Sequence, residues 1–139
     1  MSVPPEIIDA ARRWTRWASE DHALARVTSA NTELVPRGAC MWAHQAGEKA
    51  IKAVLVAYDI DPPKLHDLDR LTQRFPEAAR TLLVSVDLAS LSRWAIDARY
   101  PDDFEEATRA QAAAAVACAH EVLVIVTRHL DDLFGGAST

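Results

Sequence analysis

The sequence predicts an all-α protein, an antiparallel up-and-down bundle of four long helices and one short helix. Apolar residues recur at three- and four-residue steps through most of the chain, which is the spacing of one helix face. Prolines and glycines stand between these periodic segments, where helices tend to begin and end. Only 4 residues are glycine and 6% are aromatic, which argues against a turn-rich β-sandwich or barrel.

The two N-terminal helices have clear apolar stripes. The first is predicted over residues 5–30, where Ile7, Trp14 and Ala25 share one face and Arg12 and Arg16 fall off it. The second is predicted over residues 38–58, and a glycine at position 47 lies on its apolar face. Glycine costs about 1 kcal/mol relative to alanine inside a helix. We therefore expect another helix to approach closely there.

Prolines divide the rest of the chain. Pro62 and Pro63 place a loop at residues 59–65, and a short helix is predicted over residues 67–75. Pro76 begins a long helix predicted to reach residue 98, and the last helix is predicted over residues 104–134. The acidic run at its start contains two pairs with capping-box spacing, Asp102 with Glu105 and Asp103 with Glu106.

Length and composition predict one globular domain over residues 1–139, with helices over about residues 5–134 and short termini. The net charge of −5 argues against a broad, non-specific coat for nucleic acid but allows a local basic site. No signal peptide is visible, and the strongest apolar stretch, residues 122–127, is too short for a membrane span. These features predict a cytoplasmic protein without a membrane partner, in which Cys40 and Cys118 are buried free thiols.

Three blocks of the sequence form a specific pattern. Residues 40–53 read C-M-W-A-H-Q-A-G-E-K-A-I-K-A, residues 62–68 read P-P-K-L-H-D-L, and residues 98–101 read A-R-Y-P. In order and spacing they resemble the second helix (C-x-x-A-Q-Q-A-A-E-K-A-L-K-A), the proline loop and the A-R-Y-P segment of HEPN domains. These are small all-α domains often encoded beside minimal nucleotidyltransferases in prokaryotes. The resemblance covers nearly the whole chain.

The resemblance implies a bundle of about five helices that pairs as a homodimer across a cleft, beside a nucleotidyltransferase partner. Many HEPN proteins are metal-independent ribonucleases, and several are toxins of toxin–antitoxin pairs. Their signature is an arginine and a histidine separated by a short spacing near the start of the last long helix. Here the first histidine after Arg99 is His120, so the signature is not at its usual place.

Two other arginine–histidine pairs have the spacing of that signature, Arg16 with His22 and Arg37 with His44. Twelve arginines and 5 histidines in 139 residues give about one such match by chance. Neither pair lies where the family keeps its motif.

The three lysines of the chain, Lys49, Lys52 and Lys64, all lie in or beside the blocks that resemble the family. A local basic cluster in an acidic protein favours an anion site, so Lys49 and Lys52 are predicted phosphate-binding residues. Alternatively, Lys52 forms a surface ion pair with Glu48, one helical turn away.

Three further residues are candidates for chemistry. Arg99 suits phosphate binding because its guanidinium is a planar fork of donors, and Tyr100 beside it can stack on a base. His66 is a candidate acid–base group because imidazole titrates near neutrality. The alternative interpretations are structural: Arg99 satisfies the last carbonyls of a helix, Tyr100 packs under the turn, and His66 caps or packs the loop.

The sequence favours a module that binds the phosphates of a nucleotide or RNA beside a nucleotidyltransferase, in a pair of the toxin–antitoxin type. One alternative is a metal-independent ribonuclease with Arg99 and His66 as catalytic residues, and a further alternative is a non-catalytic dimer adaptor. His44 and Glu48 lie one turn apart, but no Glu-x-x-His completes a di-iron motif and no Gly-rich phosphate loop occurs. Neither a metal nor a cofactor is predicted.

Overall fold

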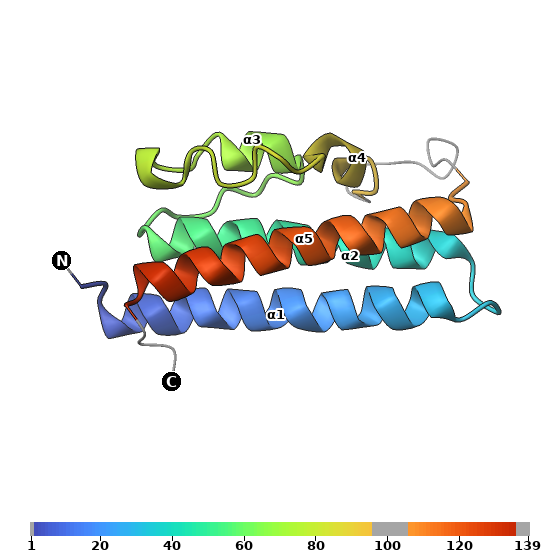
Figure 1. Ribbon diagram of the computed structural model, residues 1–139, viewed down its shortest axis with the longest axis horizontal. Coiled ribbons are helices and arrows are strands. Elements are labelled where there is room, and N and C mark those ends of the chain that lie inside the picture. The colour runs from blue at the N-terminus through green and yellow to red at the C-terminus, as the bar shows by residue number, and fades with distance from the viewer. Residues whose placement is uncertain (1, 96–105, 136–139) are drawn as a thin grey trace.

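The computed structural model describes residues 2–95 and 106–135, and every regular element within these ranges is helical (Figure 1). The all-α class is therefore confirmed. Three long helices, α1 (Pro5–Ala30), α2 (Pro36–Ala57) and α5 (Arg109–Leu133), pack together, and α2 and α5 both run antiparallel to α1. Two short helices, α3 (Leu68–Thr72) and α4 (Leu88–Ser92), form a layer over α2 with the 3-10 turn Glu77–Ala79 between them in the sequence.

The helices begin where the local chemistry favours a start. Pro5 and Pro36 occupy the first turns of α1 and α2, where the fixed φ of proline suits the helix and its missing N–H is no loss. The shorter helices have side-chain caps: Asp67 accepts a hydrogen bond from the backbone N–H of Arg70, and Asp87 accepts one from that of Ser90. The second helix thus starts two residues before the predicted position.

The long helix predicted from Pro76 to residue 98 is wrong. The chain instead forms tight turns after the 3-10 segment, with hydrogen bonds between residues three apart, and Asp87 then starts α4. The apolar stripe predicted for that helix is not the buried one: Leu82 and Val86 are only partly buried and Ala89 is exposed. The core residues of this segment are Ala79, Leu83, Leu88 and Leu91, which are buried from successive short pieces. Residues 96–98 lie outside the described ranges. The bundle therefore has three long helices among the described residues, rather than four.

The start of the last helix also differs from the prediction. Residues 106–108 precede the helix, and Thr108 caps α5 in a reciprocal capping box with Gln111. The predicted cap pairs do not start this helix; Asp102, Asp103 and Glu105 lie outside the described residues. Thr108 and Gln111 have the same spacing as a capping box but were not among the predicted pairs.

The core combines an alanine seam with a layer of larger side chains. Ala11, Ala18 and Ala25 recur every seven residues along α1 and are fully buried, which lets α1 lie close to α2. At Gly47 a Cβ atom would stand 2.9 Å from Leu91 Cδ2, so the predicted close approach of another helix is confirmed and the helix is α4.

Both cysteines are free, as predicted, but only Cys40 is buried and Cys118 is half-buried. Burial raises the pKa of the Cys40 thiol to about 11, so it stays protonated at neutral pH. By length and composition α5 would suffice for a membrane span, although a core helix passes the same test. Here α5 packs against α1, α2 and α4, and the cytoplasmic location stays a prediction.

Candidate functional site

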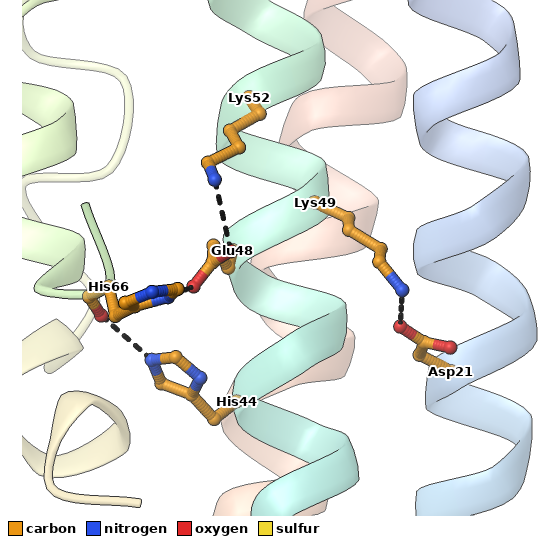
Figure 2. A network of polar contacts seen from close by, with 6 residues as sticks. All are labelled: Asp21, His44, Glu48, Lys49, Lys52 and His66. Carbon is orange, nitrogen blue, oxygen red and sulfur yellow. Dashed lines mark hydrogen bonds and ion pairs between the residues drawn. The ribbon is translucent and has the colours of Figure 1, made fainter. Parts of the chain in front are cut away.

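Glu48 of α2 joins two of the predicted site residues. Its carboxylate accepts a hydrogen bond from Lys52 Nζ at 3.1 Å and another from His66 Nδ1 at 2.8 Å (Figure 2). Glu48 is only 6% exposed and Lys52 only 9%. The expected ion pair with Lys52 is thus present, but it is buried, whereas the sequence predicted a surface pair.

The loop that carries His66 is held to α2 by a second histidine. His44 is fully buried, and its Nε2 lies 2.8 Å from the backbone carbonyl oxygen of His66. Because a carbonyl only accepts, Nε2 carries the proton, and His44 Nδ1 has no hydrogen-bond partner. Burial lowers the pKa of His44 and keeps it neutral. These contacts favour the loop-packing role of His66.

Lys49 points away from this network. It forms an ion pair with Asp21 of α1, which is 7% exposed, whereas Lys52 and Glu48 face the His66 loop (Figure 2). The structure therefore brings Lys52 and His66 to one carboxylate but does not bring Lys49 to them. Arg99 and Tyr100 lie outside the described residues, so their predicted roles stay predictions.

A different set of cations lines a groove between α1 and α5. We call it the α1–α5 groove, and it has two adjoining sections. The arginine section is an open depression of about 680 Å³. The apolar section is an open depression of about 450 Å³ and shares His22, Arg26 and His120 with the first. The arginine section is lined by Arg12, Thr15, Arg16, Ser19, His22, Arg26, His120, Leu123, Val124, Thr127 and Arg128. The apolar section adds Ser29, Ala30, Ala113, Val116 and Ala117.

The arginines of this groove differ in their partners. Arg12 pairs with Asp131 at 2.7 Å and lies over the Phe134 ring, so it ties α1 to the end of α5. Arg16, Arg26 and Arg128 are exposed, and no carboxylate among the described residues forms an ion pair with them. No described acidic residue lines either section. Cations without a local counterion leave a positive potential that attracts anions.

Two histidines face each other between these arginines. The rings of His22 and His120 have centroids 5.4 Å apart, and His22 Nε2 lies 3.3 Å from the carbonyl oxygen of Val116. Since that oxygen accepts, Nε2 carries the proton and Nδ1 holds the lone pair. Burial lowers the pKa of His22, and the charges of His120 and Arg26 lower it further. Imidazole is the side chain best suited to proton transfer near neutral pH, so the pair is a candidate acid–base group.

The sequence contained part of this signal. Arg12, Arg16, His22 and Arg26 fall at steps of four, six and four residues, which keeps them on one side of α1. Arg16 and His22 also have the spacing of the family signature. The contribution of α5 was not visible, because only tertiary packing places His120 and Arg128 against that side. Among the described residues, no group of three histidine, cysteine, aspartate or glutamate residues is arranged to hold a metal.

Comparison with known proteins identifies relatives by sequence and by structure. The HEPN domain family matches residues 11–130. The crystal structure of TT1696 from Thermus thermophilus is 25% identical, with a TM-score of 0.71 over 85% of this chain and 96% of that one. The crystal structure of ST0689, an archaeal HEPN homologue, is 23% identical, with a TM-score of 0.66 over 86% and 97% of the two chains. A comparison with curated proteins finds no match.

Proposed function

Because this chain belongs to the HEPN domain family, we propose that it is a module that binds the phosphates of a nucleotide or RNA in the α1–α5 groove. The observation that carries the proposal is the set of exposed arginines, Arg16, Arg26 and Arg128, which form no ion pair among the described residues. They stand together in a protein whose net charge is −5. Guanidinium groups bind phosphate oxygens with paired, charge-assisted hydrogen bonds.

The groove replaces the two lysines as the source of positive charge in this proposal. Lys49 and Lys52 each face a buried carboxylate, so a phosphate would have to compete with Asp21 or Glu48 for them. Binding at the groove requires no existing ion pair to break. Arg99 and Tyr100 keep their predicted role as additional phosphate and base contacts.

Binding to labelled single-stranded RNA at low salt tests the proposal directly. We expect Arg16→Glu and Arg128→Glu to weaken binding about tenfold each, since each reverses a charge that faces the anion. Arg13→Glu is the matched control, because Arg13 is exposed on the same helix and does not line the groove. Failure of the unaltered protein to bind RNA or nucleotide would leave the adaptor interpretation.

A second function has one observation in its favour, the facing pair His22 and His120. In a metal-independent ribonuclease, the ribose 2′-oxygen attacks the adjacent phosphorus and the bond from phosphorus to the 5′-oxygen breaks. In this scheme His22 Nδ1 takes the 2′-hydroxyl proton, and His120 gives a proton to the leaving 5′-oxygen. The arginines would stabilise the charge on the phosphoryl oxygens.

Incubation of RNA with the protein in EDTA separates cleavage from binding. Products ending in 2′,3′-cyclic phosphate and 5′-hydroxyl, lost in His22→Ala and in His120→Ala, would support this second function. Intact RNA with unaltered binding would leave the binding module alone. His66→Ala completes the test, because loss of cleavage there would return the catalytic role to the residue predicted from the sequence.

The partners are proposed on other grounds. The family resemblance supports a nucleotidyltransferase partner, and co-expression with one encoded beside this chain, followed by size-exclusion chromatography, tests it. A homodimer is supported by large apolar side chains left 39–44% exposed on α1 and α2, namely Trp17, Leu24 and Trp42. Light scattering tests the dimer; a monomeric mass for the unaltered protein would contradict it.

A further inference from the structure

The α1–α5 groove is longer than the phosphate group of one nucleotide. Arg12 contacts Asp131, and His22 contacts the carbonyl of Val116, so the antiparallel register places Arg128 level with residues 14–16 of α1. Arg16 and Arg128 therefore mark one end of the positive track and Arg26 marks the other. At 1.5 Å per residue, the ten residues from Arg16 to Arg26 span about 15 Å along the helix.

The lining of the groove limits which part of a ligand it can recognise. Neutral hydroxyls of Ser19 and Thr127 and the two facing imidazoles lie between the charged ends. The apolar section beyond them is lined by small aliphatic side chains of Ala30, Ala113, Val116 and Ala117. No described tryptophan, tyrosine or phenylalanine lines either section. The groove can thus follow a backbone, but it offers no aromatic platform for stacked bases.

We propose that the ligand of this groove is a single-stranded oligonucleotide whose backbone runs along α1 and α5 and contacts the arginines at both ends. The inference rests on the proposed function and names its substrate class. Phosphates advance by about 3.4 Å per nucleotide in a stacked strand, so the four phosphates of a tetranucleotide with a 5′-phosphate span about 10 Å. The flexible arginine side chains at the two ends cover the rest of the track. A nucleoside triphosphate carries all its phosphates at one end and reaches only one group of arginines.

A duplex fits this track less well than a single strand. The backbone of a duplex turns a full circle in about 10 base pairs. Over four phosphates it therefore rotates away from a straight groove between two antiparallel helices. A flexible strand can keep each phosphate against the track. Because the bases meet no stacking platform, we expect little difference in affinity between uridine-rich and adenosine-rich strands.

A length series measures the span of the site. Fluorescence anisotropy uses 2′-O-methyl oligonucleotides with a 5′-phosphate, so that a tetranucleotide carries four phosphates. Because these ligands cannot undergo 2′-hydroxyl attack, binding is kept separate from any cleavage. We expect affinity to rise at least about tenfold from the dinucleotide to the tetranucleotide, since the longer ligand reaches both ends. Beyond the tetranucleotide the gain should be slight. Two other ligands are compared with the tetranucleotide. One is ATP, and the other is a duplex whose strands repeat the tetranucleotide sequence.

Charge reversals at the two ends test whether one ligand contacts both. Arg16→Glu and Arg26→Glu should each weaken the tetranucleotide about tenfold, whereas for ATP only one of the two should matter. Arg13→Glu is the matched control on the same helix, and thermal melting confirms that each variant is folded. Equal affinities for ATP and the tetranucleotide would overturn the inference, and so would equal affinities for the duplex and the single strand. Either result would leave the proposed function standing. If no phosphate-bearing ligand binds, the proposed function itself fails.

Discussion

The lysines of α2 and the arginines of the α1–α5 groove differ in what stands opposite each charge. Lys49 and Lys52 face Asp21 and Glu48, carboxylates that are 7% and 6% exposed. In the groove Arg16 and Arg128 are exposed, and the described residues give them no carboxylate. A charge that is buried with its counterion contributes to specifying the fold, whereas an exposed charge without one is available to a ligand.

This contrast changes how the basic residues of the sequence should be ranked. The family-like block drew attention to its lysines, yet their charges are already neutralised inside the bundle. The arginines of α1 looked like the solvated side of an amphipathic helix. Only the partner helix α5 distinguishes a groove from an ordinary polar surface, through His120 and Arg128.

The largest expected effect is on stability, at Glu48. We expect Glu48→Ala to lower the free energy of unfolding by about 3–5 kcal/mol, because it leaves Lys52 and the His66 loop without their shared acceptor. Urea denaturation followed by circular dichroism measures the loss. Glu20→Ala, at an exposed position of α1, is the control and should change stability by less than about 0.5 kcal/mol. Equal midpoints for both variants would show that the network is dispensable.

The ion pair on the other side of α2 should matter less. Lys49 has a side chain that is 27% exposed, so it recovers some hydration when its partner is removed. Asp21→Asn is expected to cost about 1–3 kcal/mol. The double variant Asp21→Asn with Lys49→Met should recover part of the loss, since no unpaired cation remains. Additive losses in urea midpoints would contradict a direct coupling of the two residues.

Substitutions of the exposed arginines in the groove should have the opposite effect to substitutions in the two ion pairs of α2. They should weaken ligand binding without changing the stability of the fold. For a single strand, each phosphate contact contributes about 0.7 to the slope of log affinity against log salt concentration. Arg128→Ala should reduce the slope by that amount and leave the melting temperature unchanged. Arg12→Ala is the informative comparison on the same groove, because Arg12 pairs with Asp131 and should also destabilise the bundle. A change of melting temperature in Arg128→Ala would show that it too is structural.

The fold was predictable where one local signal dominated. Residues 5–30 were predicted correctly as a helix because periodicity and proline agree there. Between Pro76 and Leu91 the same apolar spacing fits either one helix or a series of turns. The choice depended on the Asp87 cap and on contacts with α2 and α5. In this segment the wrong backbone conformation also gave the wrong buried residues, since Leu83 and Leu88 are buried rather than Leu82 and Ala89.

The site was less predictable, because pairing is a tertiary property. The i,i+4 spacing correctly predicted that Glu48 and Lys52 pair, but it could not show that the His66 loop covers them. The partner of Lys49 is 28 residues away in the sequence. The groove combines residues more than 90 positions apart, such as His22 and Val116. Apart from Glu48 with Lys52, no short window of the sequence contains both sides of these contacts.

The smallest expected effect is a dependence on pH that originates at His44. Burial holds its pKa below the ordinary value near 6.5 in the folded protein, whereas the unfolded chain has the ordinary value. Above about pH 7.5 both states are neutral, and this residue contributes no pH dependence. As the pH falls below that value, the unfolded state takes up the proton first, so the free energy of unfolding decreases. His22 and His129 also have lowered pKa values and act in the same direction.

A single substitution isolates the share of His44. In His44→Gln the side-chain amide can still donate to the carbonyl of His66 but does not titrate. We expect the unaltered protein to lose more stability between about pH 7.5 and about pH 5.5 than this variant does. The difference in urea midpoint between the two proteins at each pH measures it. Equal losses would mean that His44 takes up its proton as readily in the folded bundle as in the unfolded chain. That outcome would contradict the lowering of the His44 pKa by burial, which leaves Nδ1 without a hydrogen-bond partner.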